Sequence, residues 1–505
     1  MKFKQFISIF LSVVLTLFLW ESVQAQTGNQ SDITNIDTQE FINPDTNTTI
    51  ENRTIVNEPE FNNTFLDTTP EEGIEQFEEL QAVEYSQYLG TPLFGEISSH
   101  EEIGDQLNKL AKLTGRNAAI LYVTSLEDKL SLILVPPKPA EKDLLNENKN
   151  LKTKPQLFAQ NNQYKVGEVV REIVVEANSS EIEKNAKEFR SQVTNSRSNT
   201  YFNSANKLYN WIIKPIEPAL ELNKIHTIVF CLDSGLRTLP VAALYDGEKF
   251  LIEKYSVGLI PSFSLTDTRY VPIVKSDILA LGISQSTEGQ EPLPSVPLEI
   301  QTVSKEIWPN RGQTLLNQES TLENLESLSR QKHFGILHLA THGDFKPGSI
   351  NNSYIQLWNQ KLRVDQIKNI SRELGWQKDP KVEMLVLSAC RTAVGSNEAE
   401  LGFSGLSVQA GVKSVLGSLW YVSDQGSLAL MTKFYEQLNI NGLRSESLRQ
   451  AQLAMLTQKV RITDKELYLS TEKAIPLPPE LNNLGTINLS HPYYWSAFTM
   501  VGNWN

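Results

Sequence analysis

Two short stretches decide the fold class of this chain: Phe334-Gly-Ile-Leu-His-Leu-Ala-Thr-His-Gly at 334–343 and Val382-Glu-Met-Leu-Val-Leu-Ser-Ala-Cys at 382–390. Each is an apolar run that ends in a reactive side chain, His342 in the first and Cys390 in the second. Short apolar runs are typical of strands covered on both faces, as in parallel sheets. Because ligands bind beyond the carboxyl ends of parallel strands, we expect His342 and Cys390 at the same edge of one sheet.

Further apolar runs and helical patterns surround these two stretches. Runs at 227–232 and 278–283 predict two more buried strands, and helical spacing at 297–308 and 320–328 predicts helices. The preceding residues predict an amino-terminal α/β subdomain at 76–199, with strands at 118–123, 130–135 and 169–175. Two helices, broken near 195–199, are predicted within 179–222, where this subdomain joins the next. The predicted fold class is α/β, with a mostly parallel sheet flanked by helices.

His342 and Cys390 are residue types that act together in nucleophilic catalysis. A cysteine thiol has a free pKa of about 8.5 and is mostly protonated at neutral pH, so a neighbouring imidazole activates it. Gly343, directly after the histidine, lets the backbone approach a substrate closely, and its N–H is suited to an oxyanion hole. We therefore expect His342 to be the base and Cys390 the nucleophile of an acyl transfer.

Four blocks follow one another along the chain: Leu337-His-Leu-Ala-Thr-His-Gly-Asp-Phe, Leu387-Ser-Ala-Cys-Arg-Thr-Ala-Val-Gly, Gly411-Val-Lys-Ser-Val-Leu-Gly-Ser-Leu-Trp-Tyr-Val-Ser-Asp and His491-Pro-Tyr-Tyr-Trp-Ser-Ala-Phe. Upstream stands Leu236-Arg-Thr-Leu-Pro-Val-Ala-Ala-Leu. These blocks resemble those of CHAT-domain peptidases, relatives of separases and caspases, and the resemblance covers about 200–505. The separation of 390 − 342 = 48 residues resembles the histidine–cysteine spacing of about 50 in caspases.

The resemblance implies a caspase-like α/β peptidase domain at 200–505, preceded by a pseudo-caspase-like subdomain at 76–199. It implies a catalytic dyad of His342 and Cys390, with the amides of Gly343 and Cys390 at the oxyanion. The segment Trp-x-Val-x-Asp also resembles separases, in which the aspartate contacts a basic side chain of the substrate; here that residue is Asp424. The tetratricopeptide repeats usual upstream in the family are absent from the sequence.

Asp424 and two other histidines have simpler interpretations. Asp424 is also suited to cap the helix expected at 426–437. His338 lies four residues before His342, but residues four apart in a strand are about 13 Å apart, so a shared metal ion is not expected. We expect His338 to be a core residue and His491 to be structural.

The two cysteines are not expected to form a disulfide. Cys231 lies near the end of the run at 227–232, and the His342 strand is expected between that strand and the Cys390 strand. Two strand spacings would place the cysteine backbones about 9–10 Å apart, beyond the limit of about 7 Å for bridging. We therefore expect Cys231 to be a buried apolar filler.

Composition and charge exclude several function classes. The 46 basic and 59 acidic side chains give a net charge of −13, which disfavours nucleic acid as a partner because phosphate binding relies on clustered Lys and Arg. The sequence contains no phosphate-binding loop, dinucleotide-binding motif, serine-hydrolase motif or zinc-ligand spacing. We expect no cofactor and no metal ion.

The amino-terminal residues resemble a secretory signal. Lys2 and Lys4 precede an uncharged stretch at 6–20, and Val23-Gln24-Ala25 supplies the small residues that a signal peptidase reads. A helix of fifteen residues spans about 22 Å, short of a hydrocarbon core of about 30 Å. We expect a cleaved signal at 1–25, with an uncleaved membrane anchor at 6–20 as the alternative. Residues 26–75 are polar, acidic and aperiodic, which predicts a disordered spacer.

The sequence as a whole predicts an exported, periplasmic or extracellular, cysteine endopeptidase whose partner is a protein or peptide substrate cleaved after Arg or Lys. One alternative is a catalytically silent CHAT module with an interaction or regulatory role in the cell envelope. Another is a transpeptidase or amidase that acts on wall peptides. The presence of both His342 and Cys390 favours the peptidase.

Overall fold

The structure is a computed structural model that describes residues 65–505, except 94–95, 140–163, 393–395, 471–472 and 482–484. At 389–392 and 397 the description is limited to the backbone. The expected signal at 1–25 and the expected spacer up to residue 64 lie outside the described residues, so these two stay predictions.

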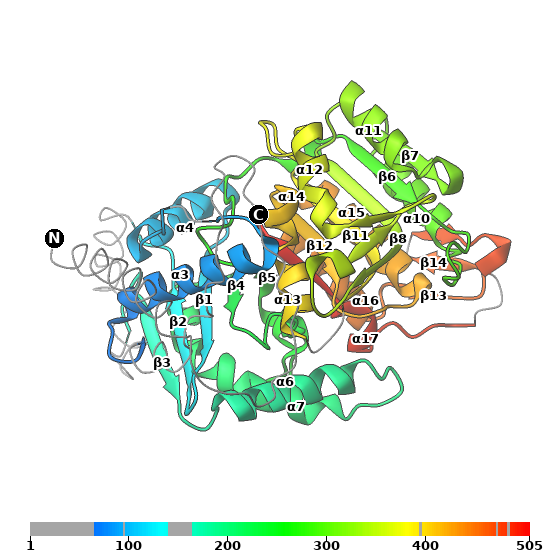
Figure 1. Ribbon diagram of the computed structural model, residues 1–505. Coiled ribbons are helices and arrows are strands. Elements are labelled where there is room, and N and C mark those ends of the chain that lie inside the picture. The colour runs from blue at the N-terminus through cyan, green and yellow to red at the C-terminus, as the bar shows by residue number, and fades with distance from the viewer. Residues whose placement is uncertain (1–64, 94–95, 140–163, 393–395, 471–472, 482–484) are drawn as a thin grey trace, which may run out of the picture. The chain divides into compact units, whose positions relative to one another are not determined.

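Thirteen strands form one sheet that runs through both predicted subdomains (Figure 1). They are β1 (Ala118–Ser125), β2 (Leu130–Val135), β3 (Val170–Val174), β4 (Thr227–Leu232), β5 (Ser256–Leu259), β6 (Ile278–Gly282), β7 (Gly312–Leu316), β8 (Ile336–Phe345), β9 (Tyr354–Gln356), β10 (Lys361–Arg363), β11 (Met384–Thr392), β12 (Ser414–Ser418) and β16 (Phe498–Gly502). Their order is β10-β9-β8-β11-β12-β16-β5-β4-β1-β2-β3, with β6 paired to β8 and β7 to β6. A second, small sheet consists of β13 (Arg461–Ile462), β14 (Glu466–Tyr468) and β15 (Ala474–Pro476).

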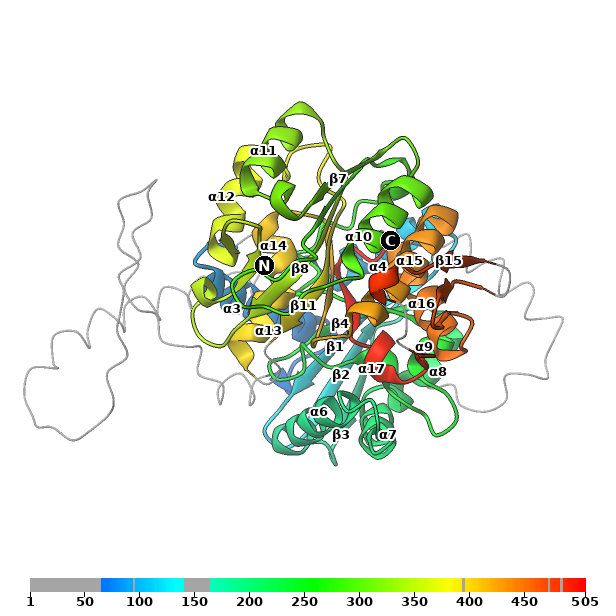
Figure 2. The ribbon, with the colours of Figure 1, turned by 90° about the vertical axis from the view of Figure 1, so that its right-hand side faces the viewer.

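Helices cover both faces of the large sheet (Figure 2). They are α3 (Pro70–Leu89), α4 (His100–Thr114), α6 (Ser179–Val193), α7 (Tyr201–Ile212), α8 (Glu217–Leu222), α9 (Leu251–Lys254), α10 (Val296–Gln301), α11 (Leu322–Gln331), α12 (Val364–Leu374), α13 (Asn397–Ser404), α14 (Leu406–Ala410), α15 (Asp424–Asn441), α16 (Arg444–Leu456) and α17 (Pro492–Trp495). Around β8 and β11, helices α11 to α14 lie on one side and α10, α15, α16 and α17 on the other. Within the described residues, no helix combines the length and apolar character needed to cross a bilayer.

The side chains of β1 point alternately into two cores, because successive residues of a strand face opposite sides of the sheet. Leu121 shares one core with Phe189 of α6. Tyr122 belongs to the other core, where its ring meets that of Phe77 of α3 edge to face, with centroids 5.6 Å apart. The predicted amino-terminal subdomain is therefore a sheet with helices on both faces.

The strands on the two sides of the β12–β16 junction run in opposite directions. β7, β6, β8, β11 and β12 are parallel to one another, and so are β16, β5, β4 and β1, whereas β12 and β16 are antiparallel. The outer strands β2, β3, β9 and β10 pair antiparallel. The predicted fold class, with a mostly parallel sheet flanked by helices, is confirmed.

This topology corrects the expected position of the His342 strand. That strand, β8, does not lie between the strands of Cys231 and Cys390; β12, β16 and β5 do. Four strand spacings, about 19 Å in all, separate β4 from β11. The two cysteines are therefore too far apart for a disulfide because three strands lie between them, and not because of the His342 strand. Cys231 is free and fully buried, and its thiol lies 3.3 Å from the carbonyl oxygen of Pro261, which confirms it as a core filler.

Order begins before residue 75, where the spacer was expected to end. α3 starts at Pro70, and Thr69 and Glu72 form a capping box: each side chain accepts the backbone N–H of the other, at 3.2 and 3.0 Å. Phe65 and Ile74 are fully buried. Acidic residues in the first turn of a helix are favourable, because the amino-terminal end carries partial positive charge. The acidic composition at 65–75 thus belongs to a helix start.

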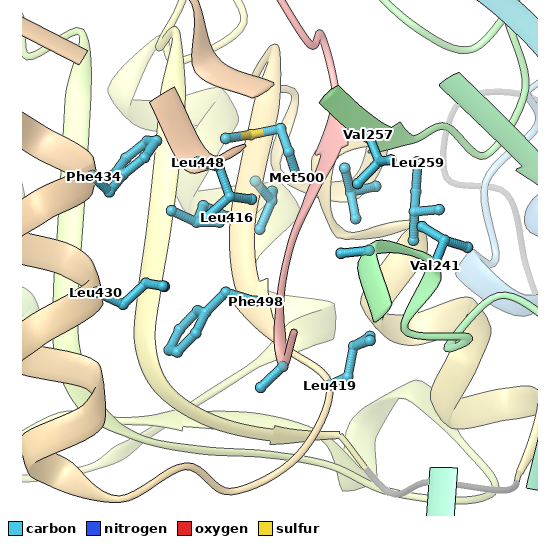
Figure 3. Packing of buried hydrophobic residues seen from close by; sticks show 14 of the residues in the cluster. Val241, Val257, Leu259, Leu416, Leu419, Leu430, Phe434, Leu448, Phe498 and Met500 are labelled. Atoms are coloured by element: carbon cyan, nitrogen blue, oxygen red, sulfur yellow. The ribbon is translucent and has the colours of Figure 1, made fainter. Parts of the chain in front are cut away.

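Large apolar side chains fill the space between the centre of the sheet and helices α15 and α16 (Figure 3). Leu416 of β12 and Met500 of β16 lie on the sheet side, and Phe434 of α15 and Leu448 of α16 on the helix side. All four are at most 1% exposed. Burial of a side chain of this size contributes about 1.5–3 kcal/mol. This core therefore fixes β12 and α15, between which the segment 419–423 runs.

Candidate active site

A bulge in β8 sets the register of the two reactive strands. β8 and β11 are parallel neighbours, and Leu339 of β8 lies opposite Leu387 of β11. At the next register position His342 lies opposite Ala389, so β8 advances three residues where β11 advances two. A bulge bends a strand and re-aims the side chain that follows it. The extra residue thus decides how His342 is presented at the end of β8.

Gly343 and Cys390 occupy the same register position on β8 and β11. Gly343 also pairs with Ile355 of β9, so it lies between two strands. Neighbouring strands are about 4.8 Å apart. The expectation that His342 and Cys390 lie at the same sheet edge is confirmed. The side chain of Cys390 lies outside the described part of the structure, and the oxyanion role of the two amides stays a prediction.

A backbone carbonyl orients the imidazole of His342. Nε2 of the ring lies 2.7 Å from the carbonyl oxygen of Glu291, in the loop before α10. A carbonyl oxygen only accepts hydrogen bonds, so Nε2 carries the proton and Nδ1 of the neutral ring holds a lone pair. In this arrangement one ring nitrogen orients the base and the other can accept a proton, as is needed to activate a nucleophile.

The ring of Tyr421 lies beside the ring of His342. The two rings are nearly parallel, with an interplanar angle of 11° and centroids 6.3 Å apart, which is offset stacking. Tyr421 is 41% exposed, whereas Trp420 and Val422 on either side are buried. Burial raises the pKa of the Tyr421 hydroxyl, and the negative charges of Asp424 and, to a smaller extent, Glu291 raise it further. Tyr421 therefore lies close to His342 and to Asp424.

Asp424 is the first residue of α15 and not its cap. The N-cap is Ser423, whose hydroxyl accepts the N–H of Gly426 at 3.0 Å. The alternative in which Asp424 caps the helix is therefore wrong, because the serine one residue earlier occupies that position. Oδ2 of Asp424 instead accepts the backbone N–H of Ser295, at 2.7 Å. Ser295 directly precedes α10, so this carboxylate joins the starts of two helices.

Burial raises the pKa of Asp424 to about 6. The hydrogen bond from Ser295 lowers this pKa, and the negative charge of Glu299 raises it. At neutral pH the carboxylate is ionised but incompletely solvated. A nearby cation favours the charged form of such a group, so Asp424 is suited to bind a positively charged side chain.

The histidines expected to be structural are confirmed as such. His338 is fully buried and is hydrogen-bonded through both ring nitrogens. Nδ1 of His491 accepts the N–H of Tyr493 at the start of α17, and its Nε2–H donates to the carbonyl of Ser198 at 2.9 Å. Over the described ranges, no three His, Cys, Asp or Glu side chains are grouped so that they could hold a metal ion.

Three contributors to the site were not predicted: the carbonyl of Glu291, the N–H of Ser295 and the ring of Tyr421. Every residue carries a backbone carbonyl, so no side-chain pattern marks Glu291. Pro292 and Pro294 indicate an irregular loop and are the available signal. Tyr421 belongs to the block at 411–424 that resembles the family, and its position between two large apolar residues gave no reason to separate it from the core.

Comparisons with families, solved structures and curated proteins gave the following results. The CHAT domain family matches residues 203–503 of the chain. Among solved structures, two crystal structures of the separase–securin complex of Saccharomyces cerevisiae, at 2.6 and 3.0 Å, are each 10% identical over 85% of this chain, with TM-scores of 0.40 and 0.37. This chain spans 33% of the chain that it matches in each. No curated protein matches it.

The family match covers more than half of the chain. It contains β8 and β11, which bring His342 and Cys390 to one sheet edge, and the segment that ends in Asp424. The chain therefore belongs to the CHAT-domain family.

Proposed function

We propose that this protein is a cysteine endopeptidase in which His342 is the base for Cys390. The observation that supports the proposal most is the hydrogen bond from Nε2 of His342 to the carbonyl of Glu291. It leaves the lone pair of Nδ1 for a proton, on a residue that lies one strand away from Cys390. A purely structural histidine at this position would not need a cysteine on the neighbouring strand.

The reaction is an acyl transfer in two stages. Nδ1 of His342 takes the thiol proton of Cys390, and the thiolate attacks the carbonyl carbon of the scissile peptide bond. When the tetrahedral intermediate collapses, the C–N bond breaks and His342 returns the proton to the departing amine. A water molecule, deprotonated by His342, then hydrolyses the thioester and releases Cys390.

The developing oxyanion needs donors that are already in place. The amides of Gly343 and Cys390 are the proposed pair, since the two residues lie at one register position and Gly343 has no side chain to keep a substrate away. Loss of one such donor typically lowers kcat by about a hundredfold to a thousandfold.

Asp424 is the proposed determinant of specificity, with cleavage after Arg or Lys. Its carboxylate is partly buried, and the accompanying segment also carries Tyr421 beside His342. The substrate residue just before the scissile bond is called P1. A P1 Arg can bind a carboxylate through two parallel hydrogen bonds, and a P1 Lys through one charge-assisted hydrogen bond. Export, through cleavage after Ala25, completes the proposal and rests on the amino-terminal sequence.

Labelling with a thiol-reactive, peptide-based probe tests the proposal. The probe should label wild-type protein and Cys231→Ala, but not Cys390→Ala, because Cys231 is buried and its thiol has a pKa raised well above the ordinary value by burial. Peptide hydrolysis should follow the same pattern. Folded wild-type protein that neither reacts with the probe nor cleaves peptides would instead be a silent interaction module.

A further inference from the structure

A buried polar group behind the site is not used by the proposed mechanism. It consists of His338 of β8, Glu299 of α10 and Tyr435 of α15, which are at most 1% exposed. A carboxylate at this depth is costly unless hydrogen bonds or a charge satisfy it. The contacts of these three side chains must therefore offset the cost of burying the Glu299 carboxylate.

Hydrogen bonds join the three side chains in a row. Nε2 of His338 donates to Oε1 of Glu299, at 2.9 Å, because a carboxylate accepts. Nδ1 of His338 lies 3.1 Å from the Tyr435 hydroxyl. Burial raises the pKa of Tyr435 well above its ordinary value, with a further contribution from Glu299, so the hydroxyl keeps its proton and donates to Nδ1. Both nitrogens of a neutral His338 are thus satisfied.

Glu299 connects this row to Asp424 through the backbone of Ser295. The N–H of Glu299 donates to the carbonyl of Ser295 at 3.0 Å, one helical turn earlier. The N–H of Ser295 donates to Asp424 at 2.7 Å. The hydrogen bond from His338 of β8 to Glu299 of α10 thus sets where Ser295, at the start of α10, presents its N–H to the Asp424 carboxylate.

The segment 291–295, which ends at Ser295, also contacts His342, the proposed base. Glu291, four residues before Ser295, supplies the carbonyl that accepts from His342. Between the two, Leu293 is buried, and its N–H donates to the carbonyl of Ser284 at 2.9 Å. The segment 291–295 therefore contacts His342 at one end and Asp424 at the other.

We propose that the buried Glu299–His338 pair positions the segment 291–295, and through it both the ring of His342 and the carboxylate of Asp424. Glu299 and His338 are positioning residues, since neither contacts the reacting atoms. This inference rests on the proposed function and names how its base and specificity determinant are held together. A displacement of about 1 Å in such a site can cost about a hundredfold in rate.

Apolar packing is the competing explanation for how α10 is held. Val296 and Ile300 share a buried cluster with Ala280 of β6 and Ala340 of β8. α10 approaches β6 so closely that a Cβ on Gly282 would lie 2.5 Å from Val296. If this packing alone fixed the helix, the Glu299–His338 bond would contribute to stability without affecting the site.

Substitution of Glu299, with a matched control, separates the two explanations. Glu299→Leu removes the acceptor, whereas Glu299→Gln keeps an oxygen for the N–H of His338. The control is Glu78→Leu: Glu78 is also fully buried and accepts from Tyr122, Phe263 and Ser264, at 2.7–2.8 Å, in another part of the protein. Both leucine variants should lower the thermal midpoint.

Two measurements report on the site itself. The first is the ratio of kcat/KM for a P1 Arg peptide to that for the same peptide with a neutral P1 residue. The second is the tautomer of His342, read from the nitrogen chemical shifts of its ring, which does not need activity. Glu299→Leu should lower the ratio at least about tenfold and mix the two tautomers. Glu299→Gln and Glu78→Leu should leave both measurements as in wild type at about pH 8, where Asp424 is ionised whether or not residue 299 carries a charge.

The inference is overturned if folded Glu299→Leu matches Glu78→Leu in both the ratio and the tautomer. If Glu299→Leu does not fold, Tyr435→Phe replaces it. This variant removes the hydroxyl that donates to His338, and it should mix the tautomers of His342 to a smaller extent. An unchanged tautomer in folded Tyr435→Phe overturns the inference. Failure of the proposed function looks different: wild-type protein then cleaves no peptide, while the tautomer still shifts in Glu299→Leu.

Discussion

Gly343 and Cys390 lie opposite each other on neighbouring parallel strands because one extra residue in β8 precedes His342. Without that bulge, counting from Leu339 opposite Leu387 would place His342 itself opposite Cys390. Because side chains alternate along a strand, a shift of one residue turns each side chain to the other face. The bulge therefore leaves a glycine beside Cys390 and moves the histidine one position away.

Removal of either member of the proposed dyad should abolish peptide cleavage. We expect Cys390→Ala and His342→Ala each to retain less than about a tenth of the wild-type rate, and the double variant to be no worse than either single one, since the two act as a unit. Steady-state hydrolysis, with thermal unfolding as the check on folding, measures this. A folded His342→Ala variant that keeps more than about a tenth of the wild-type rate would exclude His342 as the base.

Glu291 should act through its backbone and not through its side chain. We expect Glu291→Ala to keep kcat within about threefold on a substrate with a neutral P1 residue, because alanine supplies the same carbonyl to Nε2 of His342. The matched comparison is Tyr421→Ala, which removes the ring that lies beside His342 and should lower kcat more strongly. Equal losses in the two variants would contradict a backbone role.

Preference for basic substrates should depend on the ionisation of Asp424. Burial raises the pKa of this carboxyl to about 6, so the negative charge that binds a P1 cation is present above that pH and lost below it. The ratio of kcat/KM for P1 Arg to that for a neutral P1 residue should therefore rise between about pH 5 and 7. Because both substrates are cleaved by the same proposed dyad, the pH dependence of the dyad cancels in this ratio.

Asp424→Ala should lower kcat/KM for P1 Arg at least about a hundredfold, which corresponds to about 2.8 kcal/mol at about 1.4 kcal/mol per decade. The variant should also lose the pH dependence of the ratio. Unchanged cleavage after Arg, or a wild-type preference for acidic P1 residues, would show that Asp424 only joins α15 to Ser295.

Asp424 should also destabilise the folded protein as the pH rises. Its folded-state pKa, about 6, is above the ordinary value, so the native state holds the proton more tightly than the unfolded state. Stability from this group falls between about pH 4 and 6 and stays low above that range. Asp424→Asn keeps an oxygen for the N–H of Ser295 and should be more stable than wild type at pH 7, by on the order of 1–2 kcal/mol. Denaturant unfolding at pH 4 and 7 should show the difference only at pH 7.

The export prediction concerns residues that the structure does not describe. The basic residues Lys2 and Lys4, the apolar stretch at 6–20 and Val23-Gln24-Ala25 predict a mature chain that begins at Gln26 outside the cytoplasm. Amino-terminal sequencing of protein from each cell fraction measures this. An intact Met1 on membrane-bound protein would favour the anchor at 6–20.

The inner strands could be predicted because their physical requirement is local. A strand covered on both faces needs an unbroken apolar run, and the runs at 227–232, 278–283, 334–340 and 382–389 became β4, β6, β8 and β11. Strand β16 could not be placed in the same way. Its insertion between β12 and β5 depends on pairing over long distances in the sequence, and this insertion moved Cys231 away from Cys390.

The sequence by itself determined which side chains carry the chemistry: a histidine followed by glycine at one strand end, and a cysteine at the next. Only the tertiary structure decided how that histidine is oriented, what Asp424 contacts and which serine caps α15. The physical reason is that residue type specifies what a side chain can do, whereas backbone N–H and C=O groups are the same at nearly every position. Their role at Glu291 and Ser295 comes from where the folded chain places them.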